Sequence, residues 1–266
     1  MAKTAARKGR EGRNAGRGRA SAIPKQVALL PPLPARSSQG EGVRTRRVHA
    51  DRLRHERELL ASGHTLIAGL DEAGRGPLAG PVVAAAVMFP VEWLRGEFPA
   101  ELKDLNDSKQ LTEAQREHYF AWLTARAEVR FAIAQADAAV IDRINILQAT
   151  HRAMNDALAR LAPPPAHVLV DGLRVKSLRF PQTPLVKGDA RSYSIAAASV
   201  LAKVTRDRLM REFDREFPGY GFAEHKGYGT PAHLAALARL GPCPIHRRSF
   251  APLKAEQGEL FGRGLR

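Results

Sequence analysis

The sequence predicts an α/β domain with a mixed central β-sheet, helices on both faces of that sheet and a C-terminal helical segment. Apolar runs of strand length occur at residues 65–74, 80–89 and 129–136. The first two are close enough to pair as a hairpin around a glycine-rich loop. Later strands alternate with amphipathic helices, and a hydrophobic content of 44% supplies a core. Together these observations predict the class.

Local start and stop signals define the remaining elements. Thr112, with Gln115 three residues later, forms a capping-box pattern at the start of a helix. Asp137 is a candidate cap for a long helix that a run of three prolines ends. In chain order, we predict helices at 51–63, 112–128 and 137–161, strands at 166–172 and 183–190, a helix at about 192–217, a glycine- and histidine-rich loop at 218–229 and a helix at 230–240.

Positive charge is concentrated near the start of the chain. Residues 1–50 carry 12 Lys and Arg against 2 Glu, which accounts for +10 of the formal net charge of +15. They contain few large apolar side chains, so we predict a disordered basic arm. A folded domain at 51–253 and a flexible tail at 254–266 follow. Such an arm favours polyanions and should raise salt-dependent affinity for nucleic acid.

The single cysteine and the hydropathy pattern exclude several classes of protein. Cys243, which we expect to be buried, cannot form an internal disulfide and offers no thiolate cluster for structural zinc. No apolar run reaches the roughly 18 residues of a membrane span. We therefore expect a cytoplasmic protein without membrane contact, and nothing in the sequence indicates an oligomer.

Acidic residues stand at the ends of three predicted strands. Asp71 with Glu72, Asp171 and Asp189 each follow an apolar run, where an unpaired charge is costly. If the strands are neighbours, the carboxylates converge and repel one another, which raises their pKa values. Mg²⁺ or Mn²⁺ relieves this repulsion because both ions prefer oxygen ligands. Two such ions about 4 Å apart can support phosphodiester hydrolysis.

Simpler roles for the same residues remain open at this level. Asp189 could cap a helix, Asp171 could be a turn residue, and the acidic pair at 71–72 could bind Arg75 as an ion pair. Gly74 and Gly76, on either side of Arg75, would let the backbone approach a phosphate closely. A dinucleotide-binding loop is excluded because a strand, not a helix, follows these glycines.

Six separated motifs carry a resemblance to a known family. The stretches IAGLDEAGRGPLAGPVVAAAV, NDSKQLT, VLVDG, VKGDARSYSIAAASVLAKVTRD, HKGYGTPAHLAAL and CPIHRRSF together resemble bacterial ribonuclease HII, a type 2 RNase H, over about residues 65–253. The resemblance implies an RNase H-like fold and an endoribonuclease. Its implied substrates are RNA–DNA hybrids and duplex DNA with an embedded ribonucleotide, cut on the 5′ side to leave 3′-hydroxyl and 5′-phosphate ends. The related type HIII enzymes carry threonine where this chain has Arg75.

The resemblance also assigns roles to residues. It implies that the metal-binding catalytic residues are Asp71, Glu72, Asp171 and Asp189, with Mn²⁺ or Mg²⁺ as cofactor. It implies that Gly74, Arg75 and Gly76 read the 2′-hydroxyl and its phosphate, and that Tyr228 packs against the next deoxyribose. The 2′-hydroxyl is the group that distinguishes RNA from DNA.

Several further hypotheses concern basic residues and the tail. Lys109 and Lys187 are candidate phosphate contacts, and a basic step at 246–248 is a candidate DNA contact. Lys203 and Asp207 are spaced for an ion pair on one helix. Gln257–Phe261, QGELF, resembles the short peptides that dock into bacterial sliding clamps.

Two other functions are compatible with parts of this pattern. A DNA-directed nuclease or resolvase would share the fold and the carboxylates, although the glycine–arginine loop and Tyr228 favour ribose recognition. A binding module with an inactive site would use the basic arm alone, although four intact carboxylates argue against it.

Overall fold

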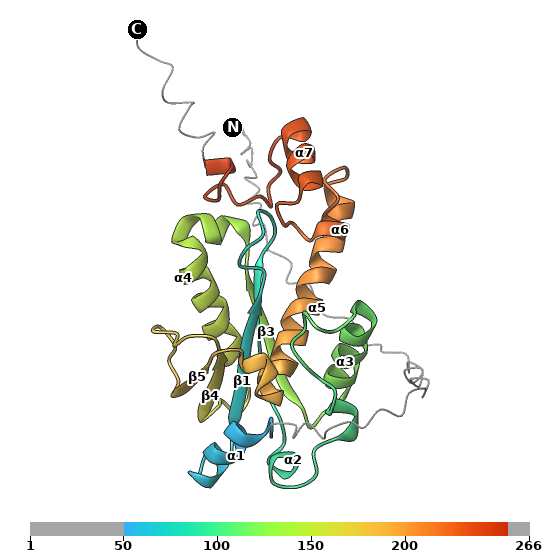
Figure 1. Ribbon diagram of the computed structural model, residues 1–266. Coiled ribbons are helices and arrows are strands. Elements are labelled where there is room, and N and C mark those ends of the chain that lie inside the picture. The colour runs from blue at the N-terminus through green and yellow to red at the C-terminus, as the bar shows by residue number, and fades with distance from the viewer. Residues whose placement is uncertain (1–50, 255–266) are drawn as a thin grey trace, which may run out of the picture. The chain divides into compact units, whose positions relative to one another are not determined.

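The structure is a computed structural model that describes residues 51–254; the predicted arm at 1–50 and the segment 255–266 lie outside the described residues. Its elements follow the predicted alternation of strands and helices (Figure 1). The helices are α1 (Arg54–Ala61), α2 (Val91–Arg95), α3 (Glu113–Ala125), α4 (Ala138–Ala159), α5 (Tyr193–Glu216), α6 (Phe222–His225) and α7 (Pro231–Leu240). The strands are β1 (Ile67–Ala73), β2 (Val82–Met88), β3 (Arg130–Ala136), β4 (His167–Asp171) and β5 (Gln182–Leu185), and short 3₁₀ turns are η1 (Ala100–Leu102) and η2 (Gly188–Ala190).

The five strands form one mixed sheet in the order β3-β2-β1-β4-β5. Strands β1, β2 and β3 are antiparallel neighbours, which confirms the predicted hairpin, whereas β4 and β5 run parallel to β1. The register of the central parallel pair aligns Leu70 with Val170. The carboxyl ends of β1 and β4 therefore lie side by side, and the mixed α/β class is confirmed.

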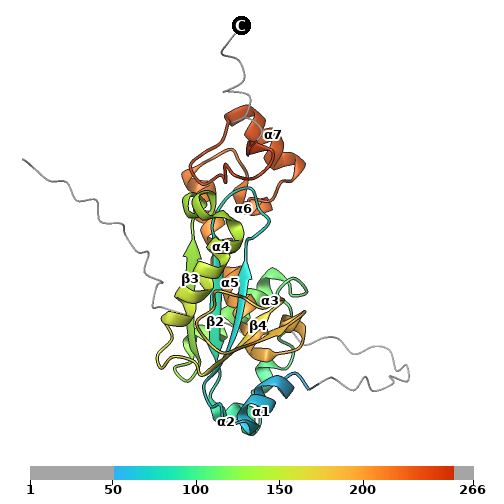
Figure 2. The same cartoon turned by 90° about the vertical axis from the view of Figure 1, so that its left-hand side faces the viewer.

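Each face of the sheet is covered by helices, as Figures 1 and 2 show. Because side chains alternate along a strand, odd- and even-numbered residues of β1 enter different cores. Ile67 packs with residues of α3 and α5, whereas Ala68 and Leu70 pack with residues of α4. None of the helices within 51–254 is long and apolar enough to cross a bilayer.

Strand β1 and helix α5 approach each other without an intervening side chain at Gly69. A Cβ atom on Gly69 would lie 2.1 Å from the carbonyl carbon of Ser194 and 2.3 Å from the backbone nitrogen of Ile195. The first turns of α5 contribute mainly small buried residues, among them Ala196, Ala197 and Ala198. This close approach sets the distance between β1 and the side chains that α5 presents further along.

The caps predicted at Thr112 and Asp137 are confirmed. At the start of α3, Thr112 and Gln115 exchange both bonds of a capping box. The side chain of Asp137 accepts a hydrogen bond from the backbone N–H of Val140, 2.8 Å away, at the start of α4. Helix α5 begins after Ser192, whose hydroxyl oxygen accepts from the N–H of Ile195.

Two predicted elements differ from the structure. The strand predicted at 183–190 is wrong beyond Leu185, because Lys187 adopts a left-handed conformation (φ 55°) and residues 188–190 turn as η2. The helix predicted at 137–161 is interrupted at Asn145, which has φ 65°. The side-chain oxygen of Asn145 accepts from the N–H of Gln148, so this residue caps the second part of the helix.

Three short elements arise where the sequence predicts irregular chain. They are α2 and η1, between β2 and α3, and α6 within the loop at 218–229. The short helix predicted at 51–63 is confirmed as α1, and its buried acid Glu56 accepts hydrogen bonds from the hydroxyls of Ser192 and Ser194. This contact joins α1 to the start of α5.

The packing at Gly69 leads to a stability prediction. We expect Gly69→Ala to lower the free energy of unfolding by about 2 kcal/mol or more, because the added methyl group must separate β1 from α5. Urea unfolding followed by circular dichroism would measure the change. Gly76→Ala is the matched control: its Cβ would meet only the Tyr228 ring, at 3.8 Å. We expect the control to change stability by no more than about 0.5 kcal/mol; equal losses in the two variants would contradict the argument.

Candidate metal centre

Three aspartates meet at the carboxyl ends of the central strands. Asp71 ends the apolar part of β1, Asp171 ends β4, and Asp189 lies in η2. One carboxylate oxygen from each lies within 4.8 Å of the other two. The backbone N–H of Gly188 donates to Oδ1 of Asp171 over 2.7 Å. That bond fixes the turn carrying Asp189 against the end of β4.

Burial and repulsion from neighbouring carboxylates raise the pKa values of Asp71 and Asp189. Asp71 and Asp189 are only 5% and 7% exposed. Burial, followed by the charges of Glu72 and Asp171, holds the pKa of Asp71 well above its usual range. Burial and the charge of Asp171 raise the pKa of Asp189 to about 6. A cation placed among these groups would favour their ionised forms.

The donor set fits a hard divalent cation. Three carboxylates from separate, rigid elements offer oxygen ligands at one point, and repulsion between them is strongest when no cation is bound. Mg²⁺ and Mn²⁺ are the ions that such oxygen donors favour. The cluster contains no histidine or cysteine ligand, which disfavours zinc.

Glu72 lies beside this cluster and is not one of its three members. Its Oε1 atom accepts a hydrogen bond from Nη1 of Arg75 at 3.2 Å, so the ion pair considered from the sequence is present. Burial raises the pKa of Glu72, and the charge of Arg75 opposes that rise. In this geometry Glu72 connects the aspartate cluster with the glycine loop that follows β1.

Of the simpler roles considered for the aspartates, helix capping by Asp189 is wrong. The helix that follows is capped by Ser192, three residues later. Oδ1 of Asp189 accepts only from the adjacent backbone N–H of Ala190, at 2.9 Å. Its carboxylate is therefore available to the cluster.

The glycine loop is shaped by close contact with a buried arginine. Gly74 has φ 96°, and a Cβ atom there would lie 2.1 Å from Nε of Arg206. Arg206 is 1% exposed and donates to the carbonyl oxygens of Ala79 and Pro81, each at 3.0 Å. Glycine is required at position 74 both by the backbone conformation and by the space.

A second buried arginine binds the same loop from the C-terminal segment. Arg247 is fully buried and donates to the carbonyl oxygens of Gly74, Arg75 and Gly80. Burial and the charge of Arg206 lower the pKa of Arg247 to about 9, so the guanidinium remains charged at neutral pH. Arg247 thus binds the loop carbonyls from the protein interior, while Arg75 and Gly76 remain exposed to solvent.

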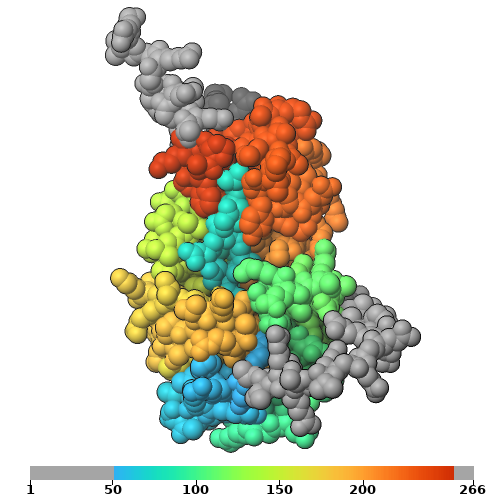
Figure 3. Space-filling model, viewed as in Figure 1, coloured from blue at the N-terminus to red at the C-terminus, as the bar shows by residue number. Residues whose placement is uncertain are grey.

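One hollow of about 310 Å³ is lined by Asp71, Glu72, Gly74, Arg75 and Tyr228. Figure 3 shows the surface of the β1–β2 loop open between α4 and the C-terminal helices. Tyr228 is 47% exposed, and its ring centre lies 6.0 Å from the Arg206 guanidinium carbon. Lys109 also lines the hollow. Burial lowers the pKa of Lys109, but attraction to Asp107 and to the three clustered aspartates outweighs that effect and raises it.

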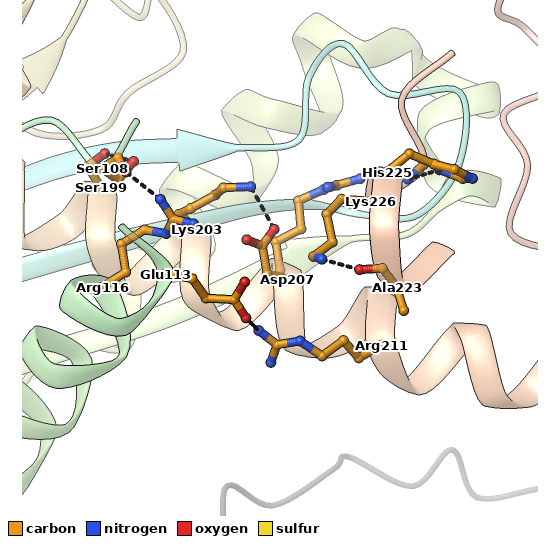
Figure 4. Close-up of polar contacts among 12 residues, drawn as sticks. Ser108, Glu113, Arg116, Ser199, Lys203, Asp207, Arg211, Ala223, His225 and Lys226 are labelled. Carbon is orange, nitrogen blue, oxygen red and sulfur yellow. Dashed lines mark hydrogen bonds and ion pairs between the residues drawn. The ribbon is translucent and has the colours of Figure 1, made fainter. Parts of the chain in front are cut away.

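Four lining residues were missed by the sequence reasoning as site residues: Ser108, Ser199, Lys203 and Arg206. Three of them lie on α5, and Figure 4 shows Ser199, Lys203 and Asp207 following one another along that helix. The hydroxyl of Ser199 donates to that of Ser108 over 2.9 Å, and Lys203 pairs with Asp207 at 2.7 Å, as predicted. Spacing on α5 could have indicated a shared face, but only the packing identifies what that face meets.

The remaining basic candidates separate into exposed and buried residues. Lys187 is exposed beside η2, next to the turn that carries Asp189. The prediction that residues 246–248 form a DNA-contacting step is wrong for His246 and Arg247, which are 1% and 0% exposed. Their side chains bind the protein interior, and only Arg248 is exposed. Cys243 is buried, as expected.

Comparisons with known proteins agree with this geometry. The family model for Ribonuclease HII matches residues 68–253. The Ribonuclease HII of Geobacter metallireducens is 56% identical over 193 residues, which cover 73% of this chain and 87% of that protein. The solved ribonuclease H2 of Pyrococcus horikoshii OT3 aligns with a TM-score of 0.60 and 26% identity over 74% of this chain and 99% of its own. RNase HII from Archaeoglobus fulgidus, solved in a complex with PCNA, gives a TM-score of 0.55 and 25% identity over 68% and 93%. The expected RNase H-like fold is confirmed.

The raised carboxyl pKa values predict a pH-dependent effect of metal on stability. In the metal-free protein, neutral carboxyls favour folding below the unfolded aspartate pKa of about 4, and this contribution is lost as pH rises through about 6. We expect Mg²⁺ to raise the melting temperature by several degrees at about pH 8 and by much less at about pH 4.5.

Asp189→Asn tests whether repulsion between ionised carboxylates destabilises the metal-free protein. Without metal at about pH 8, it should be more stable than the unmodified protein by on the order of 1 kcal/mol, because one repelling charge is gone. It should also gain less from Mg²⁺. Calorimetry would measure both effects, with the exposed Asp104→Asn as control. A Mg²⁺ effect that is independent of pH would contradict the role of the cluster.

Proposed function

The chain belongs to the ribonuclease HII family, and from this premise we propose that it nicks duplex DNA on the 5′ side of a single embedded ribonucleotide. Family membership makes the protein a metal-dependent endoribonuclease that hydrolyses the RNA strand of RNA–DNA hybrids. The proposed nick leaves 3′-hydroxyl and 5′-phosphate ends, as the first step in removing the ribonucleotide.

One observation carries the proposal. A cluster of three aspartates within 4.8 Å of one another reaches, through Asp71, a hollow that the glycine–arginine loop and half-exposed Tyr228 also line. The first group suits a metal-assisted cut at a phosphodiester. The second and third suit recognition of a ribose and of the sugar beside it. A nuclease that cuts at ribonucleotides requires both functions within one nucleotide of each other.

The residues proposed to hold the cofactor are Asp71, Glu72, Asp171 and Asp189. Mn²⁺ or Mg²⁺ bound there, as two ions, would activate the attacking water and stabilise the leaving 3′-oxygen. The protein's part is to hold the carboxylates on rigid strands and turns before any ion binds. Glu72 differs from the aspartates because Arg75 already pairs with it. We propose that it orients the loop as well as contributing a ligand.

Gly74, Arg75 and Gly76 are proposed to read the ribonucleotide. With the carbonyls of Gly74 and Arg75 bound by Arg247, the exposed edge of the loop can present its backbone N–H groups to a phosphate and a 2′-hydroxyl. The two buried arginines add positive potential below the loop, which favours an anionic ligand above it. Backbone recognition of this kind reads the sugar and leaves base identity unread.

Tyr228 and the basic residues are proposed to complete the contact with nucleic acid. The Tyr228 ring lines the hollow beside Gly76 and would pack against the deoxyribose that follows the ribonucleotide. Lys109 is drawn toward the aspartates and would bind the reacting strand, while exposed Lys187 suits a neighbouring phosphate. The basic arm at 1–50 would add affinity that falls steeply with salt.

The decisive experiment uses a labelled DNA duplex with one internal ribonucleotide, beside an all-DNA duplex and an RNA–DNA hybrid. We expect one cut 5′ to the ribonucleotide with Mg²⁺ or Mn²⁺, no cut in EDTA and none in the all-DNA duplex. Asp71→Asn should reduce the rate at least about 100-fold while binding persists, because a charged ligand becomes a neutral one. Asp104→Asn, at an exposed position, is the matched control.

Other outcomes would identify the alternative functions. Equal cutting of the all-DNA duplex would identify a DNA-directed nuclease and remove the ribose-reading role of Arg75 and Tyr228. Tight binding of all three duplexes without any cutting would identify a binding module. Cutting of the hybrid alone would leave the established activity and overturn the proposed nicking.

We also propose that Gln257–Phe261 binds a sliding clamp, although this segment lies outside the described residues. The support is the QGELF pattern with its two apolar anchors and the complex with PCNA solved for a relative. Leu260→Ala with Phe261→Ala should weaken clamp binding at least about tenfold, since groove binding depends on these two side chains. Surface plasmon resonance would measure the change. Rates on short duplexes should be unchanged, and retained clamp binding would contradict the proposal.

A further inference from the structure

A second polar cluster lies in the C-terminal part of the domain, away from the metal centre. It consists of His225 at the end of α6, His233 in α7, and His246 with Cys243 in the segment after α7. His233 and His246 are 0% and 1% exposed, and Cys243 is 8% exposed. The proposed mechanism uses none of these groups, although buried polar side chains of this kind are costly unless all their bonds are made.

The hydrogen bonds of the cluster allow one arrangement of protons. Nδ1 of His246 faces the backbone N–H of Cys243 at 3.0 Å and must therefore accept. Nδ1 of His233 faces the carbonyl oxygen of Tyr228 at 2.9 Å and must therefore donate. The two Nε2 atoms lie 3.0 Å apart, so the single proton between them belongs to His246. Both rings are neutral, and the chain of bonds runs from Cys243 to the backbone of Tyr228.

His225 holds the same loop from the other side. Its ring stacks on His233 with centroids 4.4 Å apart. Nδ1 of His225 accepts from the N–H of Gly227, and its Nε2 bonds the carbonyl of Tyr220. Figure 4 shows His225 at the opposite side of the view from Ser108 and Ser199. The carbonyl of His225 also accepts from the N–H of Tyr228, so a histidine bonds each backbone polar group of Tyr228. The Tyr228 carbonyl accepts in addition from the N–H of Thr230, 2.8 Å away.

We infer that His233, with His246 behind it, is a positioning residue that sets the orientation of Tyr228 and thereby the preference for a ribonucleotide followed by deoxyribose. The inference rests on the proposed role of Tyr228. The Tyr228 side chain is 47% exposed, and its ring lies beside Gly76, which has no side chain to hold it. Its direction is therefore set by its backbone.

The neutral state of the pair is consistent with this role. Burial and the neighbouring His233 lower the pKa of His246 to about 4, and burial also lowers the pKa of His233. Tyr220, His225, Cys243 and Arg248 are the titratable or charged groups near the pair. An added proton would have to lie on an Nδ1 or Nε2 atom that already faces an N–H, and either position breaks the chain. At neutral pH the connection to Tyr228 is therefore intact.

Two conservative substitutions separate a positioning role from a structural one. In His233→Asn, the amide nitrogen replaces Nδ1 and keeps the bond to the Tyr228 carbonyl, while the contact with His246 is lost. In His233→Gln, the amide replaces Nε2 and keeps the contact with His246, while the bond to Tyr228 is lost. Each variant loses one hydrogen bond, so a structural role alone predicts similar effects.

The readout is kcat/KM on two substrates, the duplex with one ribonucleotide and the RNA–DNA hybrid, together with melting temperatures. The ratio compared between variants is kcat/KM on the duplex with one ribonucleotide divided by kcat/KM on the hybrid. We expect His233→Gln to lower the ratio of the two values about fivefold, the size of effect that loss of one hydrogen bond produces. His233→Asn should keep the ratio within about twofold of the unmodified protein. Tyr228→Ala, the reference variant, should lower the ratio at least as far as His233→Gln.

The outcomes distinguish the inference from the function on which it rests. If Tyr228→Ala leaves the ratio unchanged, the proposed role of Tyr228 fails. If Tyr228→Ala lowers the ratio but His233→Asn and His233→Gln do not differ, the positioning inference is overturned.

A failure of His233→Gln to fold would be met by substitution at the other end of the pair. His246→Gln keeps the donor to His233, whereas His246→Asn keeps only the acceptor for Cys243. We expect the ratio to be retained in His246→Gln and lowered in His246→Asn, because the donor from residue 246 holds His233 in the tautomer that donates from Nδ1 to Tyr228. The amide of His233→Asn has no tautomer to hold, so that variant does not depend on His246. The reverse order, or no difference, would overturn the inference equally.

Discussion

Direct contact between strand β1 and the start of helix α5 is the constraint on which the site depends. No side chain separates them at Gly69, where even a methyl group would meet the backbone of Ser194. One element therefore delivers Asp71 at the end of the strand, and the other delivers Ser199, Lys203 and Arg206 along the helix. A larger residue at position 69 would change the spacing between the acidic and basic halves of the hollow. The small residues of α5 serve the same close approach.

The three clustered aspartates and the two buried arginines of this site are not paired with each other. Three aspartates repel one another on one side, and Arg206 and Arg247 lie together under the glycine loop on the other. The arginines are satisfied by backbone carbonyls, so their charge is available to a ligand. The aspartates are satisfied best by a cation. In the proposed function, a metal-bound phosphodiester would supply both partners at once and would offset the cost of burying these groups.

The C-terminal segment supports the site through backbone contacts. Arg247 binds the loop at residues 74–75, and the His233–His246 pair binds the backbone of Tyr228. Two parts of the hollow that are far apart in sequence are thus fixed from the same segment. In the proposed function, metal binding and sugar recognition would need a constant separation, because the cut would fall at a fixed distance from the ribose that is read. Shared support from one rigid segment gives that separation a physical basis.

The sequence by itself determined the strands and most helices, because period-2 and period-3.6 patterns and the caps at Thr112 and Asp137 are local signals. It also singled out the four acids, since charge after an apolar strand is conspicuous, and its motifs identified the family. It misjudged the end of β5, where a left-handed Lys187 turns the chain, and it expected His246 and Arg247 to face DNA. Only the tertiary structure decided those points. Whether a basic or polar side chain is buried depends on carbonyls contributed by distant segments, and no local pattern in the chain records them.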